Sequence, residues 1–337
     1  MKSPIVNALS FPTILLVLLC APAAAGTLDV QRPEVREFIE RMAAEHDYDR
    51  DALEGMLAVA ETKPAIIEAI SRPAEKTLAW HQYRDIFLTD ERIAAGADFW
   101  RTHDEALERI SKETGVSREV LVGVIGVETY FGRITGKYRV LDSLTTLAFD
   151  YPPRAAFFRR ELEQFLLLVR EEGMRATDAL GSYAGAMGAP QFMPSSYRAY
   201  AVDSSRDGRR DIWTDWQDVI GSIANYLVRN GWQPGTPVAT QATLGDGFSG
   251  QADPAKNTLS ATETVASLSR EGVMFATDLA DDEPGQLLVL EGDDGNEYWV
   301  GFHNFFVITR YNRSVMYAMV VHQLGREIAL KVEHGAS

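Results

Sequence analysis

Hydrophobic residues recur at intervals of three and four along most of this 337-residue chain. In residues 34–44 the apolar side chains would share one side of a helix, and Pro33 suits its first turn. These apolar positions are Val35, Phe38, Ile39 and Met42. The same spacing predicts further helices over residues 51–60, 64–70, 92–112, 155–172, 218–230 and 314–329. The pattern therefore predicts a chain that is mostly helical.

A different pattern occupies residues 232–312, which are rich in Gly, Thr and Asp and hold short alternating runs. Residues 286–291 and 297–302 flank a Gly-Asp-Asp-Gly sequence, which predicts a β-hairpin. Residues 305–309 form an apolar run that we interpret as another strand. The fold class is therefore mainly α (α+β), with a small antiparallel β part before the last helix.

These shifts divide the chain into five predicted parts. They are a leader (1–25), an N-terminal helical part (26–112), a helical core (113–231), a β-rich insertion (232–312) and a C-terminal helix that returns to the core (313–337).

The first part has the features of a signal peptide. Lys2 precedes an apolar run over residues 11–19, and Ala23-Ala24-Ala25 offers a cleavage site. We therefore expect export to the periplasm. Cys20 is the only cysteine and could carry a lipid anchor, but the bulky residue before it makes a lipoprotein the less favoured reading.

The net charge of −15 changes the range of functions. Such an acidic chain is poorly suited to a nucleic-acid partner. The sequence also contains no His-x-x-x-His pair, phosphate loop, dinucleotide fingerprint or Gly-x-Ser-x-Gly motif. We therefore expect no cofactor to be required for the chemistry.

A glutamate interrupts the apolar face of one predicted helix, which Ser117 would cap. At helical spacing Glu128 shares that face with Leu121, Val124 and Ile125. A carboxyl group in apolar surroundings tends to have a raised pKa, which is what a general acid needs. The structural alternative is a helix-end glutamate that reaches water or pairs with Arg133.

A second stretch, residues 181–196, is crowded with small residues that allow close approach of a ligand or another backbone. Ser182 and Gln191 supply neutral hydrogen-bonding groups, while Tyr183 and Met187 supply apolar surface. This combination suits a sugar with amide substituents. A tight turn before a helix would explain the same residues.

A third stretch has oxygen-bearing residues at alternate positions, as in a calcium-binding loop. Asp203, Ser205 and Asp207 take positions 1, 3 and 5, and Arg209 would offer its backbone carbonyl at position 7. The usual closing glutamate is missing, and Asp218 is one candidate for its place. A polar turn is the alternative.

Near the C-terminus, Tyr311 and Asn312 lie at the junction before the last predicted helix, and Tyr317 lies one turn into it. Polar residues at element ends often build sites, although single residues of this kind more often cap helices or face solvent.

Taken together and in this order, these stretches resemble the lytic murein transglycosylase B family. The resemblance covers residues 33–330 and rests on four segments. They are 126–129 (Gly-Val-Glu-Thr), 141–147 (Leu-Asp-Ser-Leu-Thr-Thr-Leu), 182–196 and 310–312 (Arg-Tyr-Asn). The resemblance implies a lysozyme-like helical core with an additional helical subdomain and a small antiparallel β subdomain around a long groove.

The resemblance also implies a reaction, cleavage of the β-1,4 bond between N-acetylmuramic acid and N-acetylglucosamine in peptidoglycan. Glu128 matches the family's single catalytic acid, and Ser182 matches a serine that contacts the N-acetyl group. Further residues match groove positions: Gln191, Met187, Tyr83, Arg154, Tyr311, Asn312 and Tyr317. The Asp203 loop matches an EF-hand-like calcium site that Asp218 would close. Pro153 departs from relatives that carry a second arginine there.

Glycosidases ordinarily use two carboxyl groups, and these motifs supply one. The resemblance accounts for this through a reaction that forms a 1,6-anhydro end without water. The alternatives are a hydrolytic muramidase and a non-catalytic peptidoglycan-binding protein. The expected partner is the glycan strand, with proteins of cell-wall synthesis or remodelling as further candidates, and the expected state is a monomer.

Overall fold

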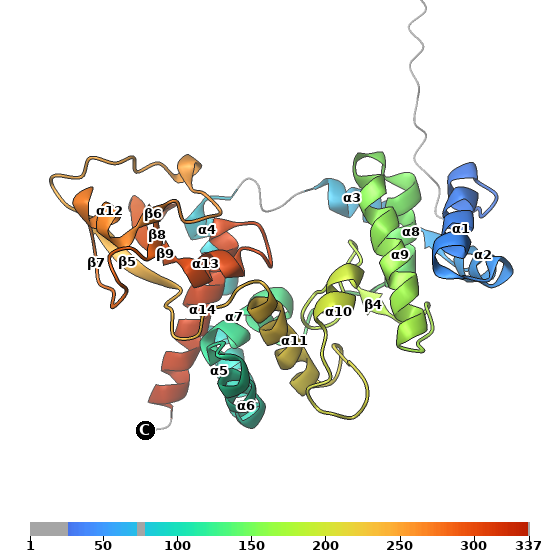
Figure 1. Cartoon of the computed structure of the whole chain (residues 1–337), viewed down its shortest axis with the longest axis horizontal. Helices are drawn as coiled ribbons and strands as arrows, with labels where there is room; N and C mark the ends of the chain where they lie inside the picture. Colours follow the sequence, from blue (N-terminus) through green and yellow to red (C-terminus); the bar gives the residue numbers. More distant parts are fainter. Residues whose placement is uncertain (1–25, 73–77, 336–337) are drawn as a thin grey trace, which may run out of the picture.

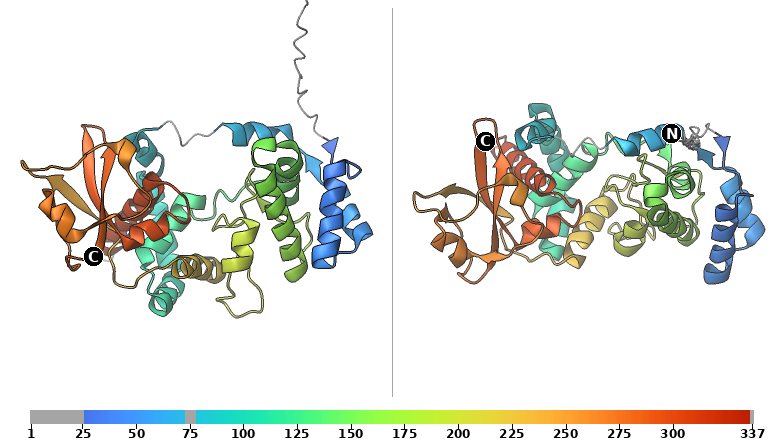
Figure 2. Two further views of the ribbon diagram at one scale, coloured as in Figure 1. Left: turned by 45° about the horizontal axis from the view of Figure 1, so that its top comes forward. Right: turned by 90° about the horizontal axis from the view of Figure 1, so that it is seen from above.

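The computed structural model describes residues 26–72 and 78–335. The predicted signal peptide, Cys20 included, lies outside them. Figure 1 shows an elongated molecule with α1 and α2 at one end, a small sheet at the other, and most helices between them. Figure 2 shows the same sequence of layers from two further sides. Within the described part of the chain, no helix is long and apolar enough to cross a bilayer.

Helices dominate the fold, as the hydrophobic spacing predicts. The helices are α1 Pro33–His46, α2 Arg50–Ala58, α3 Pro64–Ser71, α4 Trp80–Phe87, α5 Asp90–Thr102, α6 Asp104–Thr114, α7 Arg118–Thr129, α8 Val140–Asp150, α9 Ala155–Glu171, α10 Pro194–Tyr200, α11 Trp216–Arg229, α12 Val265–Arg270, α13 His303–Ile308 and α14 Val315–His334, with the 3-10 turns η1 Pro152–Arg154 and η2 Pro254–Lys256.

The strands are short except in one sheet. They are β1 Gly26–Thr27, β2 Glu61–Thr62, β3 Tyr138–Arg139, β4 Leu180–Gly181, β5 Ala239–Leu244, β6 Glu263–Thr264, β7 Val273–Phe275, β8 Pro284–Glu291 and β9 Asn296–Phe302. Five of them form one antiparallel sheet in the order β6-β8-β9-β5-β7. The predicted hairpin is confirmed, because β8 pairs with β9 across a turn closed from Gly292 N–H to Gly295 C=O at 2.9 Å.

Two predictions of secondary structure are wrong. The single helix over residues 92–112 is two helices, α5 and α6, that meet at His103. The Trp100 indole donates a hydrogen bond to Asp104 (3.1 Å), and the acidic residues that follow His103 favour a new helix start there.

Residues 305–309 are not a strand, because this apolar run lies in α13 and its end. The run is buried on every side, so its pattern could not separate a buried strand from a buried helix. The Asn304 side-chain amide fixes the start of α13 by donating to the carbonyls of Gln233 and Thr236, both at 2.8 Å.

The described residues form three hydrophobic clusters. The first gathers α4–α7, α11, α13 and α14, the second gathers α1–α3 and α8–α10, and the third lies against the five-stranded sheet. This packing divides the chain differently from the sequence boundaries. Residues 26–71 pack with α8 and α9, whereas α4–α6 pack with α7 and α14, so the segment 26–112 contributes to two cores.

Helices α7 and α14 lie in direct backbone contact although they are far apart in sequence. A Cβ atom added to Gly123 would lie 2.3 Å from the Val321 carbonyl oxygen, and one added to Gly325 would lie 2.1 Å from that of Glu119. Glycine is therefore needed at both crossing points. The C-terminal helix α14 thus packs closely against α7.

Candidate active site

Glu128 lies in the last turn of α7, where the helix stops abruptly. After Thr129, the last residue of α7, come three residues with positive φ: Tyr130 (51°), Phe131 (57°) and Gly132 (80°). Left-handed conformations are costly for bulky residues, so tertiary contacts must impose this turn. The Thr129 hydroxyl supplies one such contact by accepting the Gly132 N–H (3.1 Å) and donating to the Ala189 carbonyl (3.3 Å).

The carboxyl group of Glu128 is half-buried and receives a hydrogen bond from a tyrosine. The Tyr317 hydroxyl in α14 donates to Glu128 Oε1 at 2.5 Å. Burial and the Glu128 charge hold the pKa of the Tyr317 phenol well above its ordinary value. Tyr317 therefore stays protonated and remains a hydrogen-bond donor to this carboxyl group.

The ring of Tyr311 packs against the ring of Tyr317. The two rings are stacked with centroids 6.4 Å apart and an interplanar angle of 12°. The Tyr311 hydroxyl donates to the Pro190 carbonyl at 2.7 Å, and burial raises the pKa of this phenol as well. The stack thus connects the donor of Glu128 to the loop that carries Gln191.

The loop of residues 182–191 forms the opposite wall. The Ser182 hydroxyl oxygen accepts the backbone N–H groups of Ala184 (3.2 Å) and Ala186 (3.1 Å), so its proton is left to donate to a ligand. Gln191 has a φ of 54°, and its Nε2 donates to the carbonyls of Thr135 (3.1 Å) and Gly188 (2.8 Å). Its amide oxygen is thereby held in a fixed orientation.

Between these walls lies a cavity of about 510 Å³, which brings together Glu128, Ser182 and Gln191. Among the described residues that line it, Glu128 carries the only carboxyl group. Conventional glycosidases place two carboxyl groups 5–10 Å apart, roughly, across the bond that is cleaved. This cavity therefore suits a reaction that uses one carboxyl group.

The other predicted groove residues occupy different places. Tyr83 is buried in the first hydrophobic cluster with its ring 5.2 Å from that of Phe87. Asn312 is half-buried beside Tyr311. Arg154 is exposed in η1, with its guanidinium 4.3 Å from the ring centre of Phe157. These residues do not line the cavity that contains Glu128.

Met187, predicted as a substrate contact, does not line the cavity that contains Glu128. Its side chain is fully buried in the second hydrophobic cluster, and the two β-bridges of its backbone, to Gly181 and Phe192, turn it inward. Met187 supports the loop from within the core.

Sequence reasoning considered Arg133 only as an ion-pair partner of Glu128, and it missed Lys137 and Tyr138; all three line the cavity. They lie between the Glu128 segment and the Leu-Asp-Ser segment at 141–147. Two basic residues close together in a chain of net charge −15 were the available signal. They give the cavity cations that suit anionic substituents of a ligand.

The predicted metal loop also forms a cluster. Carboxylate oxygens of Asp203, Asp207 and Asp218 all lie within 4.8 Å of one another, although Asp218 is fifteen residues from Asp203 in the chain. Asp203 accepts the backbone N–H groups of Asp207 (3.1 Å) and Gly208 (2.9 Å), which shapes the turn. Burial raises the pKa of Asp218 even though backbone N–H groups oppose this shift.

Comparison with known proteins now decides the family. Residues 30–326 match the model of the transglycosylase SLT domain. This chain belongs to that family.

Its relatives include a membrane-bound lytic murein transglycosylase B from Escherichia coli strain K12, which is 41% identical over 307 residues, covering 88% of this chain and 83% of the relative. The crystal structure of the soluble lytic transglycosylase SltB1 from Pseudomonas aeruginosa is similar, with 49% identity, a TM-score of 0.84, and coverage of 89% of this chain and 99% of that one. The Escherichia coli lytic transglycosylase Slt35 in complex with calcium shares 39% identity and a TM-score of 0.80 over 90% of this chain and 95% of that one. The lysozyme-like fold expected from the sequence is confirmed by these structures.

Proposed function

We propose that this SLT-domain protein cleaves the β-1,4 bond between N-acetylmuramic acid and N-acetylglucosamine and leaves a 1,6-anhydro end, with Glu128 as the only acid and base. The family and its named relatives make the chain a peptidoglycan lytic transglycosylase. The observation that supports this chemistry is the cavity in which Glu128 is the single carboxyl group among the described lining residues.

In the first step the Glu128 carboxylic acid donates its proton to the glycosidic oxygen as the C1–O4 bond breaks. The 2-acetamido oxygen of the muramoyl sugar attacks C1, and the Ser182 hydroxyl, already oriented by two backbone donors, holds this acetamido group. Tyr317 stabilises the carboxylate left on Glu128 through its hydrogen bond.

In the second step the Glu128 carboxylate takes the proton of the 6-hydroxyl of the same sugar. The freed oxygen closes on C1 and displaces the acetamido oxygen. Every atom of the substrate is then in one of the two products, the proton is back on Glu128, and no water has been consumed.

Mass spectrometry of the products tests this proposal. Purified protein incubated with peptidoglycan sacculi should release anhydro-muropeptides, and the Glu128→Gln variant should release none. Products heavier by one water would identify a hydrolytic muramidase instead. If the Glu128→Gln variant digested sacculi normally, or if the wild type bound them without any product, the assignment of Glu128 would be wrong.

We further propose that the Asp203 loop holds a structural Ca²⁺ ion. Three clustered carboxylates repel one another and supply the hard oxygen ligands that Ca²⁺ prefers. Asp203, Asp207 and Asp218 would contribute carboxylate oxygens, Ser205 its hydroxyl and Arg209 its backbone carbonyl. The ion would tie the loop to the start of α11 and would take no part in the reaction. The calcium complex of Slt35 supports this reading.

We propose that the protein acts in the periplasm, as its predicted signal peptide indicates, and the membrane-bound Escherichia coli relative supports a role at the cell envelope. The glycan strand is the partner on which the enzyme acts. Association with cell-wall synthesis or remodelling proteins, and a monomeric state, remain predictions from the sequence.

A further inference from the structure

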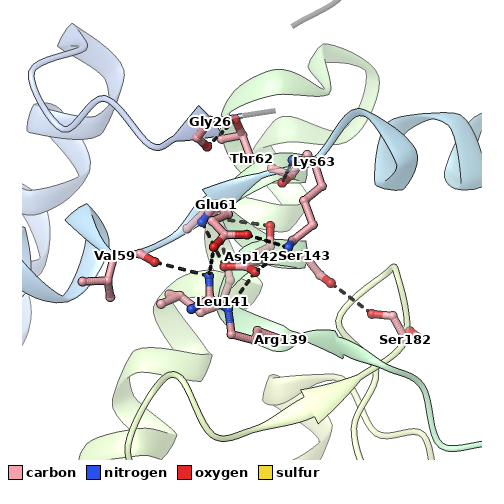
Figure 3. Close-up of polar contacts among 12 residues, drawn as sticks. Gly26, Val59, Glu61, Thr62, Lys63, Arg139, Leu141, Asp142, Ser143 and Ser182 are labelled. Carbon is pink, nitrogen blue, oxygen red and sulfur yellow. Dashed lines mark hydrogen bonds and ion pairs between the residues drawn. The ribbon is translucent and has the colours of Figure 1, made fainter. Parts of the chain in front are cut away.

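Helix α8 begins with two buried polar residues that take no part in the proposed chemistry. Asp142 and Ser143 are both fully buried, in a helix whose residues 140–149 are all buried. Polar groups at such depth are retained only when they are hydrogen-bonded. Figure 3 shows that their partners come from different segments of the chain.

The Asp142 carboxylate holds the segment of residues 59–63 and strand β3 together. Its Oδ1 accepts the backbone N–H of Glu61 (2.9 Å), and its Oδ2 accepts Nε of Arg139 (2.8 Å). The Lys63 ammonium lies 3.3 Å from the same Oδ2. A buried carboxylate with two cations and a backbone donor is well compensated, and the removal of any partner would leave charge uncompensated.

Arg139 belongs to β3, and β3 forms one edge of the active-site cavity. Tyr138 lines the cavity directly, as do Gly136 and Lys137 before it. Asp142 therefore fixes this edge through Arg139.

Ser143 holds another edge of the cavity, the one that Ser182 and its loop form. Its hydroxyl donates to the Ser182 carbonyl at 3.1 Å, and this oxygen also accepts the Gly185 N–H at 3.0 Å. The loop touches α8 a second time, because a Cβ atom added to Gly185 would lie 2.6 Å from the Leu144 side chain. Strands β3 and β4 join the two edges, with Tyr138 opposite Gly181 and Arg139 opposite Leu180.

We infer that Asp142 and Ser143 are positioning residues, which set the distance between Tyr138 and Ser182 and thereby place the Ser182 hydroxyl for the N-acetyl group of the muramoyl sugar. Neither residue touches the substrate. Asp142 acts through Arg139, and Ser143 acts through the backbone of Ser182. Asp142 also holds Glu61 and Lys63, and Arg139 itself contacts the Glu61 carboxylate (3.3 Å) and the Val59 carbonyl (3.4 Å), so this cluster couples the N-terminal helices to the cavity.

This inference rests on the proposed role of Ser182, so a double-mutant cycle is its direct test. The Ser143→Ala variant should lower kcat/KM on a defined N-acetylglucosamine–N-acetylmuramic acid tetrasaccharide by about three- to tenfold, the effect of one lost hydrogen bond. In a Ser182→Ala background the same change should have an effect of less than about twofold, because the group that Ser143 positions is gone. Ser143→Thr, which keeps the hydroxyl, should restore most of the loss.

Thr145→Val is the matched control. Thr145 is equally buried in α8, but its hydroxyl donates only within the helix, to the carbonyls of Leu141 (2.8 Å) and Asp142 (3.2 Å). This variant should change the melting temperature about as much as Ser143→Ala and leave kcat/KM unchanged. Equal losses of activity in the Ser143 and Thr145 variants would show a merely structural role and overturn the inference.

Binding separates this inference from the proposed reaction. In the Glu128→Gln background, calorimetry with the tetrasaccharide should show that Ser143→Ala raises the dissociation constant by about three- to tenfold, the same factor as expected for kcat/KM. Suppose that the wild type releases anhydro products. The positioning role would then be overturned if the effects of Ser143→Ala and Ser182→Ala were additive, or if Ser143→Ala left binding unchanged. A wild type that released none would instead contradict the proposed function.

Asp142→Asn tests the edge of the cavity that β3 forms. This variant keeps the size of the side chain and one of its two oxygens, but it removes the negative charge that Arg139 and Lys63 compensate. We expect its activity to fall by a larger factor than its folded fraction at the assay temperature. Lys63→Met should also lower activity more than the folded fraction, but by a smaller factor. If activity followed only the folded fraction, Asp142 would have no positioning role.

Discussion

Two groups of acidic side chains in this molecule differ in what surrounds them. Glu128, the one carboxyl group among the described residues that line its cavity, lies at the end of an apolar helix and accepts a hydrogen bond from Tyr317. Asp203, Asp207 and Asp218 lie together in a loop, with oxygens within 4.8 Å. The first carboxyl group lines a cavity of about 510 Å³, whereas the second group gathers three carboxylates in one loop.

The comparison shows that the partners of a carboxyl group decide its chemistry more than its burial does. Asp218 is fully buried, yet both of its oxygens accept backbone N–H groups, Oδ1 from Ser204 (2.7 Å) and Oδ2 from Asp211 (2.8 Å). Glu128 is more exposed but faces an open cavity. A carboxylate bound by backbone donors is suited to a fixed structural role, whereas one facing a cavity can exchange a proton with a substrate.

The largest expected effect separates the two groups directly. Glu128→Gln should lower kcat by at least about 10³-fold, because the amide cannot donate and recover the proton. The melting temperature should stay within a few degrees of the wild type, since the Tyr317 hydroxyl can still donate to the amide oxygen. Turnover of labelled sacculi and thermal unfolding measure the two quantities. A variant that lost stability and kept activity would reverse the comparison.

The fold could be predicted where the hydrophobic pattern had one reading. Helices α1, α9 and α14 and the hairpin of β8 and β9 follow from period and turn residues alone. The break at His103 and the helical state of residues 303–308 could not be predicted from the hydrophobic period, because side-chain hydrogen bonds favour them: a local one from Trp100 to Asp104, and a tertiary one from Asn304 to the Gln233 carbonyl.

The site was predictable in part for the same reason. Glu128 could be found because a charged residue stands out on an apolar helix face. Met187 could not be placed, since an apolar residue in a glycine-rich loop reads equally well as ligand contact or core. Lys137 was missed, and Arg133 was considered only as an ion-pair partner of Glu128, because cations beside a cavity carry no periodic pattern.

A buried histidine tests how far burial shifts a pKa in this molecule. His322 lies in α14, five residues after Tyr317, and its buried Nε2 has no hydrogen-bond partner among the described residues. Burial, with a smaller effect of Arg326, lowers its pKa to about 4 from an ordinary 6.5. Above pH 6.5 both states are neutral. As pH falls from 6.5 to 4, only the unfolded chain takes up the proton, and stability declines.

The loss should approach about 3 kcal/mol at pH 4, from the size of the shift. Replacing His322 with phenylalanine should flatten this part of the stability curve and keep the edge contact with Trp299, whose ring centre lies 6.1 Å away. Denaturant unfolding at several pH values measures the slope. If stability depended on pH equally in the wild type and the variant, His322 would take up its proton as readily in the folded protein as in the unfolded chain.

Calcium should affect the second group of acids and leave the first unchanged. At a concentration one hundred times its dissociation constant, Ca²⁺ should stabilise the wild type by about 2.7 kcal/mol. Asp207→Asn keeps an oxygen for the Arg209 N–H (2.9 Å) but removes a charge, and should abolish most of this gain with little change in kcat. Asp246→Ala, an exposed acid elsewhere, is the control. A melting temperature indifferent to chelation would show that the loop is only a turn.

The smallest effect concerns the hydrogen bond that distinguishes Glu128 from every acid in the loop. Tyr317→Phe removes the hydroxyl that lies 2.5 Å from Oε1 and leaves the ring stacked on Tyr311. A charge-assisted hydrogen bond of about 1.5 kcal/mol corresponds to a tenfold loss of kcat. Tyr226→Phe is the matched control, since its hydroxyl donates to the Arg310 carbonyl (2.6 Å) beside the same aromatic group. Equal kcat values for the wild type and Tyr317→Phe would mean that the Tyr317 hydroxyl does not adapt Glu128 to its two proton transfers.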